Sequence, residues 1–264
     1  MKTFCAVSVL FSALFCLIPA AGTMLRGEEA PGYTDTPQLP NSRWKIHDQN
    51  RPQPVKTAPG QGDIGATPPS DAVILFDGTN LNEWKGKNLQ VIENSIFDIK
   101  RTGTLQTKAK FGTCQLHIEW MTDGKREDRM HWGNSGVFFL DGSIEIQILE
   151  SHDSYIYADG NAGAVYGQYP PLVNPARKPA EWQSFDIIFT APKIEDGKQT
   201  RPAYVTVFYN GVLVQNNAEL LGTTLHRTLP KTLQKETGSI SLQEHGSSVK
   251  FRNIWVRPVS EPVL

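Results

Sequence analysis

The chain has 264 residues, with 26 Lys and Arg against 27 Asp and Glu, so its formal net charge is −1. The net charge is close to neutral, and Lys and Arg do not cluster into a basic stripe along the sequence. We therefore do not expect nucleic acid or a membrane surface as a partner. The length is enough for one large domain with a sizeable core, while the oligomeric state is left open by the sequence.

Residues 1–22 have the pattern of a secretory signal peptide. Lys2 precedes an apolar run over residues 4–18, and small residues follow it. The run is about fifteen residues long, shorter than the roughly 20 needed to span a bilayer, which argues against a retained membrane anchor. We expect a secreted or periplasmic protein. Cleavage would leave Cys114 as the single cysteine, so no intramolecular disulfide is expected.

Residues 23–70 form a Pro-rich segment that we interpret as an N-terminal arm. Its prolines break any continuous helix or central strand, and Gly, Thr and Gln fill much of the rest. One short stretch, WKIHD, is too aromatic for a simple spacer. We therefore expect Trp44, which opens this stretch, to dock the arm on the domain that follows.

Residues 71–260 read as one all-β domain. Short runs of alternating apolar and polar residues, rich in β-branched and aromatic side chains, predict strands, and no sustained helical period is found. The dipeptide Asn210-Gly211 predicts a tight hairpin. We expect a jelly-roll β-sandwich with one polar, functional sheet face. The predicted strands are 72–76, 90–100, 111–122, 134–140, 143–150, 163–166, 183–190, 203–209, 212–215, 239–243 and 249–257.

The stretch SIEIQILE is the most informative of these strands. Its isoleucines point to one face, as a half-buried strand requires, and Glu145 and Gln147 point to the other. The same parity places Glu119, Gln243 and His245 opposite the apolar residues of their own strands. Because Glu, Gln and His are acid-base and hydrogen-bonding groups, we expect these strands to share one polar floor that handles sugars. The alternative is an ordinary solvated strand face.

Six aromatic residues lie at strand ends or in Gly-rich connections, where their rings could stack on a sugar: Trp132, Tyr155, Tyr157, Tyr166, Tyr169 and Trp182. Of these, Tyr166 and Trp182 are the candidates for sugar contact, with packing in the core as the alternative. Three histidines, His117, His131 and His152, are interpreted as surface or loop residues without a functional role.

Several segments in order carry a family resemblance: LFDG from residue 75, GNSGV from 133, EIQILES from 145, YADG from 157, GAVYG from 163, PAEW from 179, LQEHG from 242 and FRNIW from 251. Together they resemble the 3-keto-disaccharide hydrolase domain family over roughly residues 72–258. That family is similar in fold to concanavalin-type lectins and glucanases. The Pro-rich arm looks like that of a planctomycete-type secreted branch. The chain departs from the pattern at Glu150, where the family has Asp, and at Ala162 and Ala176, where related members have Cys.

The resemblance implies cleavage of 3-keto-glycosides by removal of the C2 proton, elimination and hydration. Such a site needs a base, an oxyanion stabiliser and an acid for the leaving oxygen. Glu145 is the first candidate for the proton-transfer carboxylate, and His245 is its partner or the leaving-group acid. Arg252, Gln147 and Gln243 are candidates for holding hydroxyls or the developing enolate.

Asn134 and Glu119 are further candidates for substrate binding. A divalent cation held by Glu119, Glu145 and His245 is an alternative oxyanion stabiliser, but no tight metal motif is present, and no cofactor or metal ligand is assigned. Glu150 is included as a third catalytic candidate. The spacing E-x-Q-x-x-E resembles the E-x-D-x-x-E motif of laminarinase-type glucanases, although a strand bulge would be needed to bring Glu150 beside Glu145.

Three functional interpretations therefore remain. The first is a carbohydrate-active hydrolase or lyase for 3-keto-disaccharides and related glycosides. The second is a non-catalytic carbohydrate-binding module that uses the same face. The third is an ordinary retaining glycosidase that uses Glu145 and Glu150.

Overall fold

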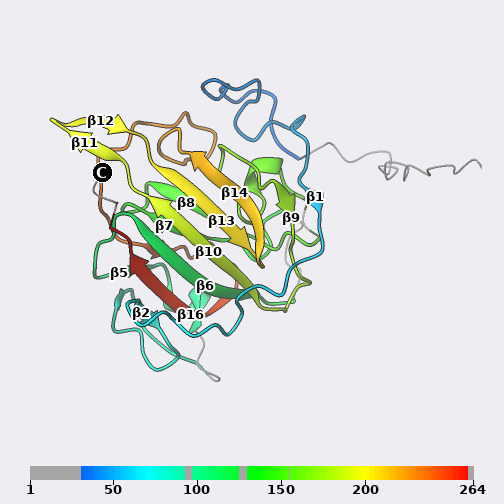
Figure 1. Ribbon diagram of the computed structural model, residues 1–264. Coiled ribbons are helices and arrows are strands. Elements are labelled where there is room, and N and C mark those ends of the chain that lie inside the picture. Colours follow the sequence, from blue (N-terminus) through cyan, green and yellow to red (C-terminus); the bar gives the residue numbers. More distant parts are fainter. Residues whose placement is uncertain (1–30, 93–96, 125–129, 154, 261–264) are drawn as a thin grey trace, which may run out of the picture.

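The computed structural model describes residues 31–92, 97–124, 130–153 and 155–260. Two antiparallel sheets lie face to face, as Figure 1 shows, and this arrangement confirms the all-β jelly-roll sandwich. The proposed signal peptide lies outside the described residues. In the part of the chain that is described, no helix is long and apolar enough to cross a membrane.

The first sheet has seven strands and faces the viewer in Figure 1. Its path runs β14, β13, β10, β6, β16, β2, and β4 also pairs with β16. The strands are β2 (Val73–Phe76), β4 (Phe97–Asp98), β6 (Cys114–Thr122), β10 (Gln183–Thr190), β13 (Tyr204–Tyr209), β14 (Val212–Glu219) and β16 (Val249–Pro258). The predicted hairpin joins β13 and β14, with Asn210 and Gly211 both at positive φ as a two-residue turn of this kind requires.

The second sheet has five strands in the order β3, β5, β15, β7, β8. They are β3 (Trp84–Lys85), β5 (Leu105–Thr107), β7 (Ser135–Phe139), β8 (Ile144–Ile148) and β15 (Ser241–Leu242). Two small sheets complete the strands: a parallel pair, β1 (Val55–Lys56) with β9 (Val173–Asn174), and a hairpin, β11 (Lys193–Glu195) with β12 (Lys198–Arg201). The helical elements are one turn each, α1 (Ile99–Thr102) and η1 (Ala158–Gly160).

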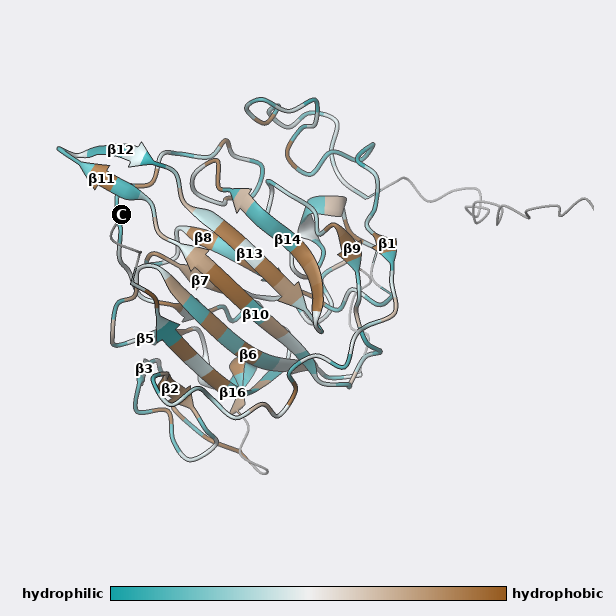
Figure 2. Ribbon diagram, viewed as in Figure 1, coloured by the Kyte–Doolittle hydropathy of each residue, from teal (hydrophilic) through white to brown (hydrophobic). Residues whose placement is uncertain are grey.

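The core lies between the two sheets and is built by strand alternation. Ile144, Ile146 and Ile148 reach it from β8, and Leu116 and Ile118 reach it from β6, all with no exposed surface. The alternation of apolar and polar residues along these strands is visible in Figure 2. Burying each such side chain contributes roughly 1.5–3 kcal/mol, so the sandwich needs no disulfide. Cys114 is a free, buried thiol within this core.

Two predicted strands differ from the structure. Within the described residues of the range 90–100, Phe97–Asp98 is the strand, and α1 begins immediately after it because the Asp98 carboxylate caps the backbone N–H of Lys100. The range 163–166 makes only isolated bridges at Val165, since Gly163 and the following Gly167, both at positive φ, turn the chain. The expected common floor is also wrong: β6 belongs to the seven-stranded sheet, whereas β8 and β15 belong to the five-stranded sheet.

The described part of the arm runs along the domain: its first, blue part lies at the upper right of Figure 1, and the chain then passes β1 and follows the lower edge to β2. Its buried residues include Ile46 and His47, at 1% and 0% exposure. Trp44 is only half-buried, under the guanidinium of Arg43 at 4.6 Å. The buried contacts of the WKIHD stretch are thus made by the residues that follow Trp44.

Candidate active site

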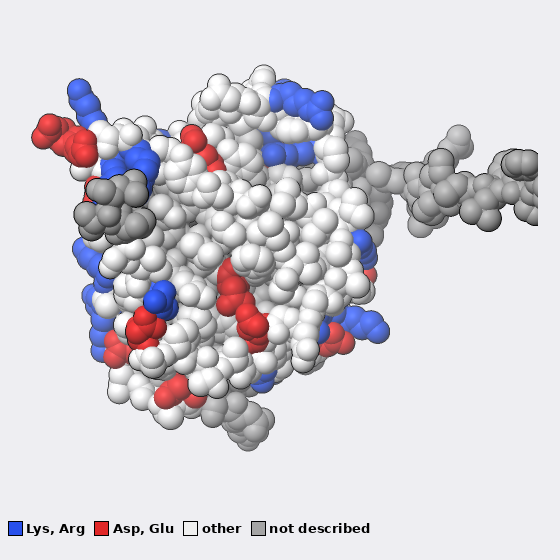
Figure 3. Space-filling view, viewed as in Figure 1, with Lys and Arg blue, Asp and Glu red and all other residues white. Residues whose placement is uncertain are grey.

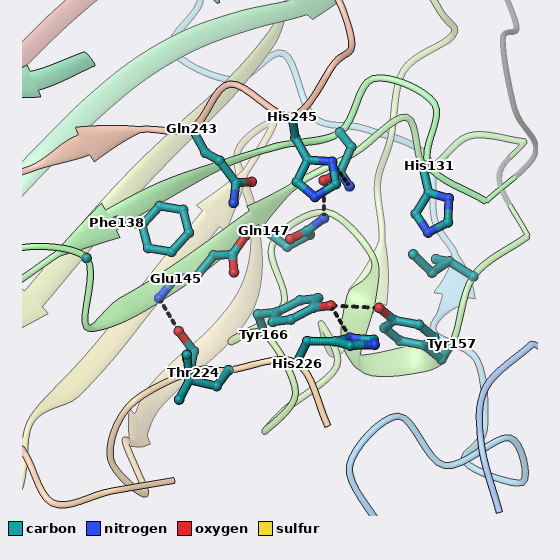
Figure 4. A pocket seen from close by; sticks show the side chains of 14 residues that line it. His131, Phe138, Glu145, Gln147, Tyr157, Tyr166, Thr224, His226, Gln243 and His245 are labelled. Atoms are coloured by element: carbon teal, nitrogen blue, oxygen red, sulfur yellow. Dashed lines mark hydrogen bonds between the residues drawn. The ribbon is translucent and has the colours of Figure 1, made fainter. Parts of the chain in front are cut away.

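A cavity of about 470 Å³ opens on the face of the five-stranded sheet that is turned away from the core (Figure 4). Glu145 and Gln147 reach it from β8, on the face opposite the core isoleucines, as the parity predicted. Gln243 and His245 reach it from the end of β15. Six of the ten predicted site residues line this cavity: Asn134, Glu145, Gln147, Tyr166, Gln243 and His245.

The carboxyl group of Glu145 differs from an ordinary surface carboxylate in its burial and in its hydrogen bonding. Its side chain lies across β7, over Gly136, where an added Cβ would stand 2.5 Å from Oε1. The Glu145 backbone N–H donates to Thr224 Oγ1 at 2.8 Å, but no described residue donates a hydrogen bond to the carboxyl oxygens. The side chain is 7% exposed, and burial raises its pKa to about 8. The group can therefore gain or lose a proton near neutral pH.

A chain of amides links β8 to His245. The Gln147 amide donates to Asn134 Oδ1 at 3.0 Å, and the Asn134 amide lies 3.3 Å from His245 Nδ1. Because an amide nitrogen can only donate, Nδ1 of His245 is the acceptor in this contact. A neutral His245 then carries its proton on Nε2. That N–H remains available to a ligand in the cavity.

Aromatic side chains form the opposite wall, which we call the tyrosine wall: Tyr157, Tyr166 and His226 (Figure 4). The two tyrosine hydroxyls are 2.7 Å apart, and Tyr166 Oη is 3.0 Å from His226 Nδ1. Burial raises the pKa of both tyrosines, so their hydroxyls stay protonated donors. Burial, together with the neighbouring His47 and Arg227, lowers the pKa of His226 and favours its neutral form.

Three residues predicted to bind substrate do not line the cavity: Glu119, Arg252 and Trp182. Glu119 on β6 and Arg252 on β16 pair at 2.7 Å on the outer face of the seven-stranded sheet, and the Arg252 guanidinium stacks on Trp182 at 4.0 Å. Each sheet of a sandwich turns its apolar residues toward the shared core. Polar residues that alternate with them therefore point outward from both sheets, to opposite sides of the molecule. The Glu119 carboxylate also accepts a hydrogen bond from the arm, from the backbone N–H of Gly65 at 2.6 Å.

Glu150 is also absent from the cavity lining. Its carboxylate accepts hydrogen bonds from Thr122 Oγ1 at 2.9 Å and from the backbone N–H of His152 at 2.8 Å. Alternation continues past β8 without a bulge, so Leu149 packs with Tyr157 on the cavity side and Glu150 turns toward the other sheet. The carboxylate pair of a retaining glycosidase is therefore not assembled from Glu145 and Glu150.

The cation set considered from the sequence does not assemble either. Glu119 is on the opposite side of the sandwich from Glu145 and His245. Within the described ranges, no group of three or more His, Cys, Asp or Glu side chains is arranged to hold a metal ion.

The sequence interpretation missed several lining residues: His131, Phe138, Thr224 and His226. The polar loop pattern around His131 predicts no role for it, yet its side chain lines the cavity. Thr224 and His226 lie on an irregular segment that has no periodic signal, so nothing in the sequence marked them. Phe138 could have been found, because it shares outward parity with Gly136 on β7. His117, interpreted as a surface residue, is instead fully buried between Asp186 and Glu119.

Charged side chains do not gather into a basic surface on the face shown in Figure 3, where Lys and Arg lie scattered toward the edges. This view agrees with the charge balance of the sequence. The cavity of Figure 4 likewise has no Lys or Arg among its described lining residues.

Comparison with known proteins gives the family. Residues 71–257 match the 3-keto-alpha-glucoside-1,2-lyase-like domain. A solved structure from Parabacteroides distasonis ATCC 8503, described as a "putative glycosyl hydrolase", is 38% identical, with 79% of this chain and 93% of that chain covered and a TM-score of 0.69. A second protein so described from the same organism, at 23% identity and a TM-score of 0.53 over 71% of this chain and 99% of its own, shares the fold. No curated protein matches the chain. The family match over most of the domain and the 38% identity together make this chain a member of the 3-keto-alpha-glucoside-1,2-lyase-like domain family.

Proposed function

We propose that this protein is a secreted or periplasmic enzyme that cleaves 3-keto-glycosides, with 3-keto-disaccharides as its substrates. Family membership supports an action on carbohydrate. The cavity supports it too, because amides, hydroxyls and aromatic rings are the groups that bind neutral sugars. The observation that carries the proposal is the buried Glu145 carboxyl group, with its raised pKa and no described hydrogen-bond donor.

The chemistry follows from the ketone. A carbonyl at C3 acidifies the hydrogen on C2, so a base can remove that proton and form an enolate. The substituent on C1 then leaves as its oxygen is protonated, and water adds to the resulting enone. Each step moves a proton or develops negative charge on oxygen, and a desolvated site lowers both barriers.

Three residues of the cavity fit these roles. Glu145 is the base at C2, because its ionised form is unstabilised by hydrogen bonds and is therefore strongly basic. Tyr166 donates its hydroxyl to the enolate oxygen at C3, with Tyr157 behind it. His245 donates from Nε2 to the leaving oxygen, and the amides of Gln147 and Gln243 hold sugar hydroxyls.

Product analysis tests the proposal. The wild-type protein is incubated with a 3-keto-disaccharide and with its unoxidised parent, and only the keto sugar should be cleaved. Glu145→Gln should lower kcat by on the order of 10²-fold or more while sugar binding persists. Glu150→Gln is the matched control, because the same change outside the cavity should leave kcat nearly unchanged. A wild-type protein that binds glycans but cleaves neither sugar is not an enzyme of this kind.

A non-catalytic carbohydrate-binding module is the second candidate. The observation in its favour is the set of rings in the cavity, Phe138, Tyr157 and Tyr166, which could stack on a sugar without any reaction. On that interpretation Glu145→Gln would change neither binding nor any product. The raised pKa of Glu145 favours the enzyme, since a binding surface has no need of a buried, unpaired carboxyl group.

A further inference from the structure

The N-terminal arm reaches the back of the tyrosine wall. Tyr33 and His47 belong to the arm, and the backbone N–H of Tyr33 donates to the His47 carbonyl at 2.8 Å, which closes this part of the arm into a loop. His47 is 0% exposed. A polar side chain buried this completely in a Pro-rich arm indicates a specific docking contact.

Asp159 on η1 is the docking partner of His47. Its carboxylate accepts from the His47 backbone N–H at 3.0 Å and lies 3.0 Å from His47 Nδ1. A carboxylate can only accept, so Nδ1 carries a proton. Arg51, also in the arm, is 3.7 Å from the same carboxylate and donates to the Gln168 carbonyl at 2.9 Å. The arm is thus fixed to a buried charge 112 residues further along the chain.

The ring of His47 packs directly on the tyrosine wall. Its centroid is 3.9 Å from that of Tyr157, 4.8 Å from that of Tyr166 and 5.1 Å from that of His226. Tyr33 adds a second contact, since its hydroxyl is 3.5 Å from His226 Nε2. All three residues of the wall line the cavity, whereas His47 does not. His47 can therefore act on the cavity only by holding these three rings.

We propose that the arm is needed for the geometry of the active site, and that His47 is a positioning residue which fixes the Tyr166 hydroxyl and the His226 ring. This inference rests on the proposed function, in which the Tyr166 hydroxyl meets the enolate oxygen. Without the His47 ring, one face of Tyr157 loses its support, and the hydroxyl pair at 2.7 Å can move. A displacement of about 1 Å at such a donor can cost on the order of 10²-fold in rate.

The test compares His47→Ala with Trp44→Ala in the full-length protein. Trp44 is the matched control, because it is a larger ring in the same arm, is half-buried and lies outside the wall contacts. His47→Ala should lower kcat by about tenfold or more and change KM by less than about threefold. Amide hydrogen exchange should become roughly tenfold faster in residues 157–167 and 222–228 but not in the strands of either sheet. Trp44→Ala should leave all of these values unchanged.

Asp159→Asn is the second variant, for the case in which His47→Ala does not fold. It keeps the shape of the side chain but removes the charge that holds His47, and the same loss of kcat and faster exchange are expected. Unchanged exchange in 157–167 and 222–228 in the folded variants would overturn the inference, as would an equal effect of Trp44→Ala. The exchange readout does not depend on catalysis. A wild-type protein without lyase activity would therefore defeat the proposed function, while faster exchange of the wall would still establish that the arm positions it.

Discussion

Gly136→Ala tests whether the Glu145 carboxyl group is the reacting group. Gly136 is the second residue of β7, beside β8, and pairs in register with Gln147. An added Cβ would stand 2.5 Å from Glu145 Oε1, 3.1 Å from its Cγ and 2.9 Å from Phe138 Cε2. The backbone of residue 136 needs no positive φ, so the substitution acts through these contacts rather than through backbone strain.

The displacement can be worked out from these distances. Ordinary contact begins at 3.4 Å, so Oε1 must move by 3.4 − 2.5, or about 0.9 Å. A shift of that size at a catalytic group costs on the order of 10²-fold in rate. Overpacking at Phe138 should also destabilise the fold by roughly 1–3 kcal/mol. At about 2–4 °C in Tm for each kcal/mol, the variant remains folded at an assay temperature of 25 °C.

The assay is kcat/KM for a 3-keto-disaccharide, with Tm measured on the same samples. Gly124→Ala is the control, because among the described residues its added Cβ meets the Ala180 Cβ alone, at 3.4 Å, an ordinary contact. Its rate should equal that of the wild type. A folded Gly136→Ala protein with the wild-type rate would refute the assignment of Glu145 as the base.

Four further outcomes follow from the buried charges. The pKa of Glu145 is about 8 in the folded protein against 4.5 in the unfolded chain, so between these pH values the folded state keeps a proton that the unfolded state has lost. The free energy of unfolding therefore falls by about 1.4 kcal/mol per pH unit between pH 4.5 and 8. Glu145→Gln lacks this loss, so its Tm advantage over the wild type should grow from pH 5 to 8. The same ionisation should make kcat/KM rise with pH toward a plateau above about 8, and a fall there would instead make Glu145 an acid. Burial alone would lower the pKa of His117, but Asp186 and Glu119 outweigh it and raise the pKa to about 9. His117→Gln should therefore cost about 3 kcal/mol below pH 6.5, a deficit that shrinks as the pH rises through 9 and that denaturant titration can follow. Glu150→Gln should lower the free energy of unfolding by about 1–2 kcal/mol in the same titration, because it weakens the hydrogen bonds that Glu150 accepts. A large loss of kcat in this variant would instead show that Glu150 takes part in the reaction.

The sequence by itself determined the fold class and much of the cavity floor. Alternation in β8 fixed which side chains enter the core, so Glu145 and Gln147 had to share the other face. The same rule placed Gln243 and His245 outward at the end of β15. These predictions succeeded because side-chain direction in a strand has a period of two, which is a local property of the backbone.

Only the tertiary structure decided which sheet each strand joins. Glu119 and Glu145 obey the same parity but lie on opposite outer faces, because their strands belong to the two sheets that face each other across the core. His226, which belongs to the tyrosine wall, and His47, which packs on it, carry no periodic signal, and each lies on an irregular segment. Their positions depend on long-range burial and on the Asp159 carboxylate, and contacts of that kind leave no local pattern in a sequence.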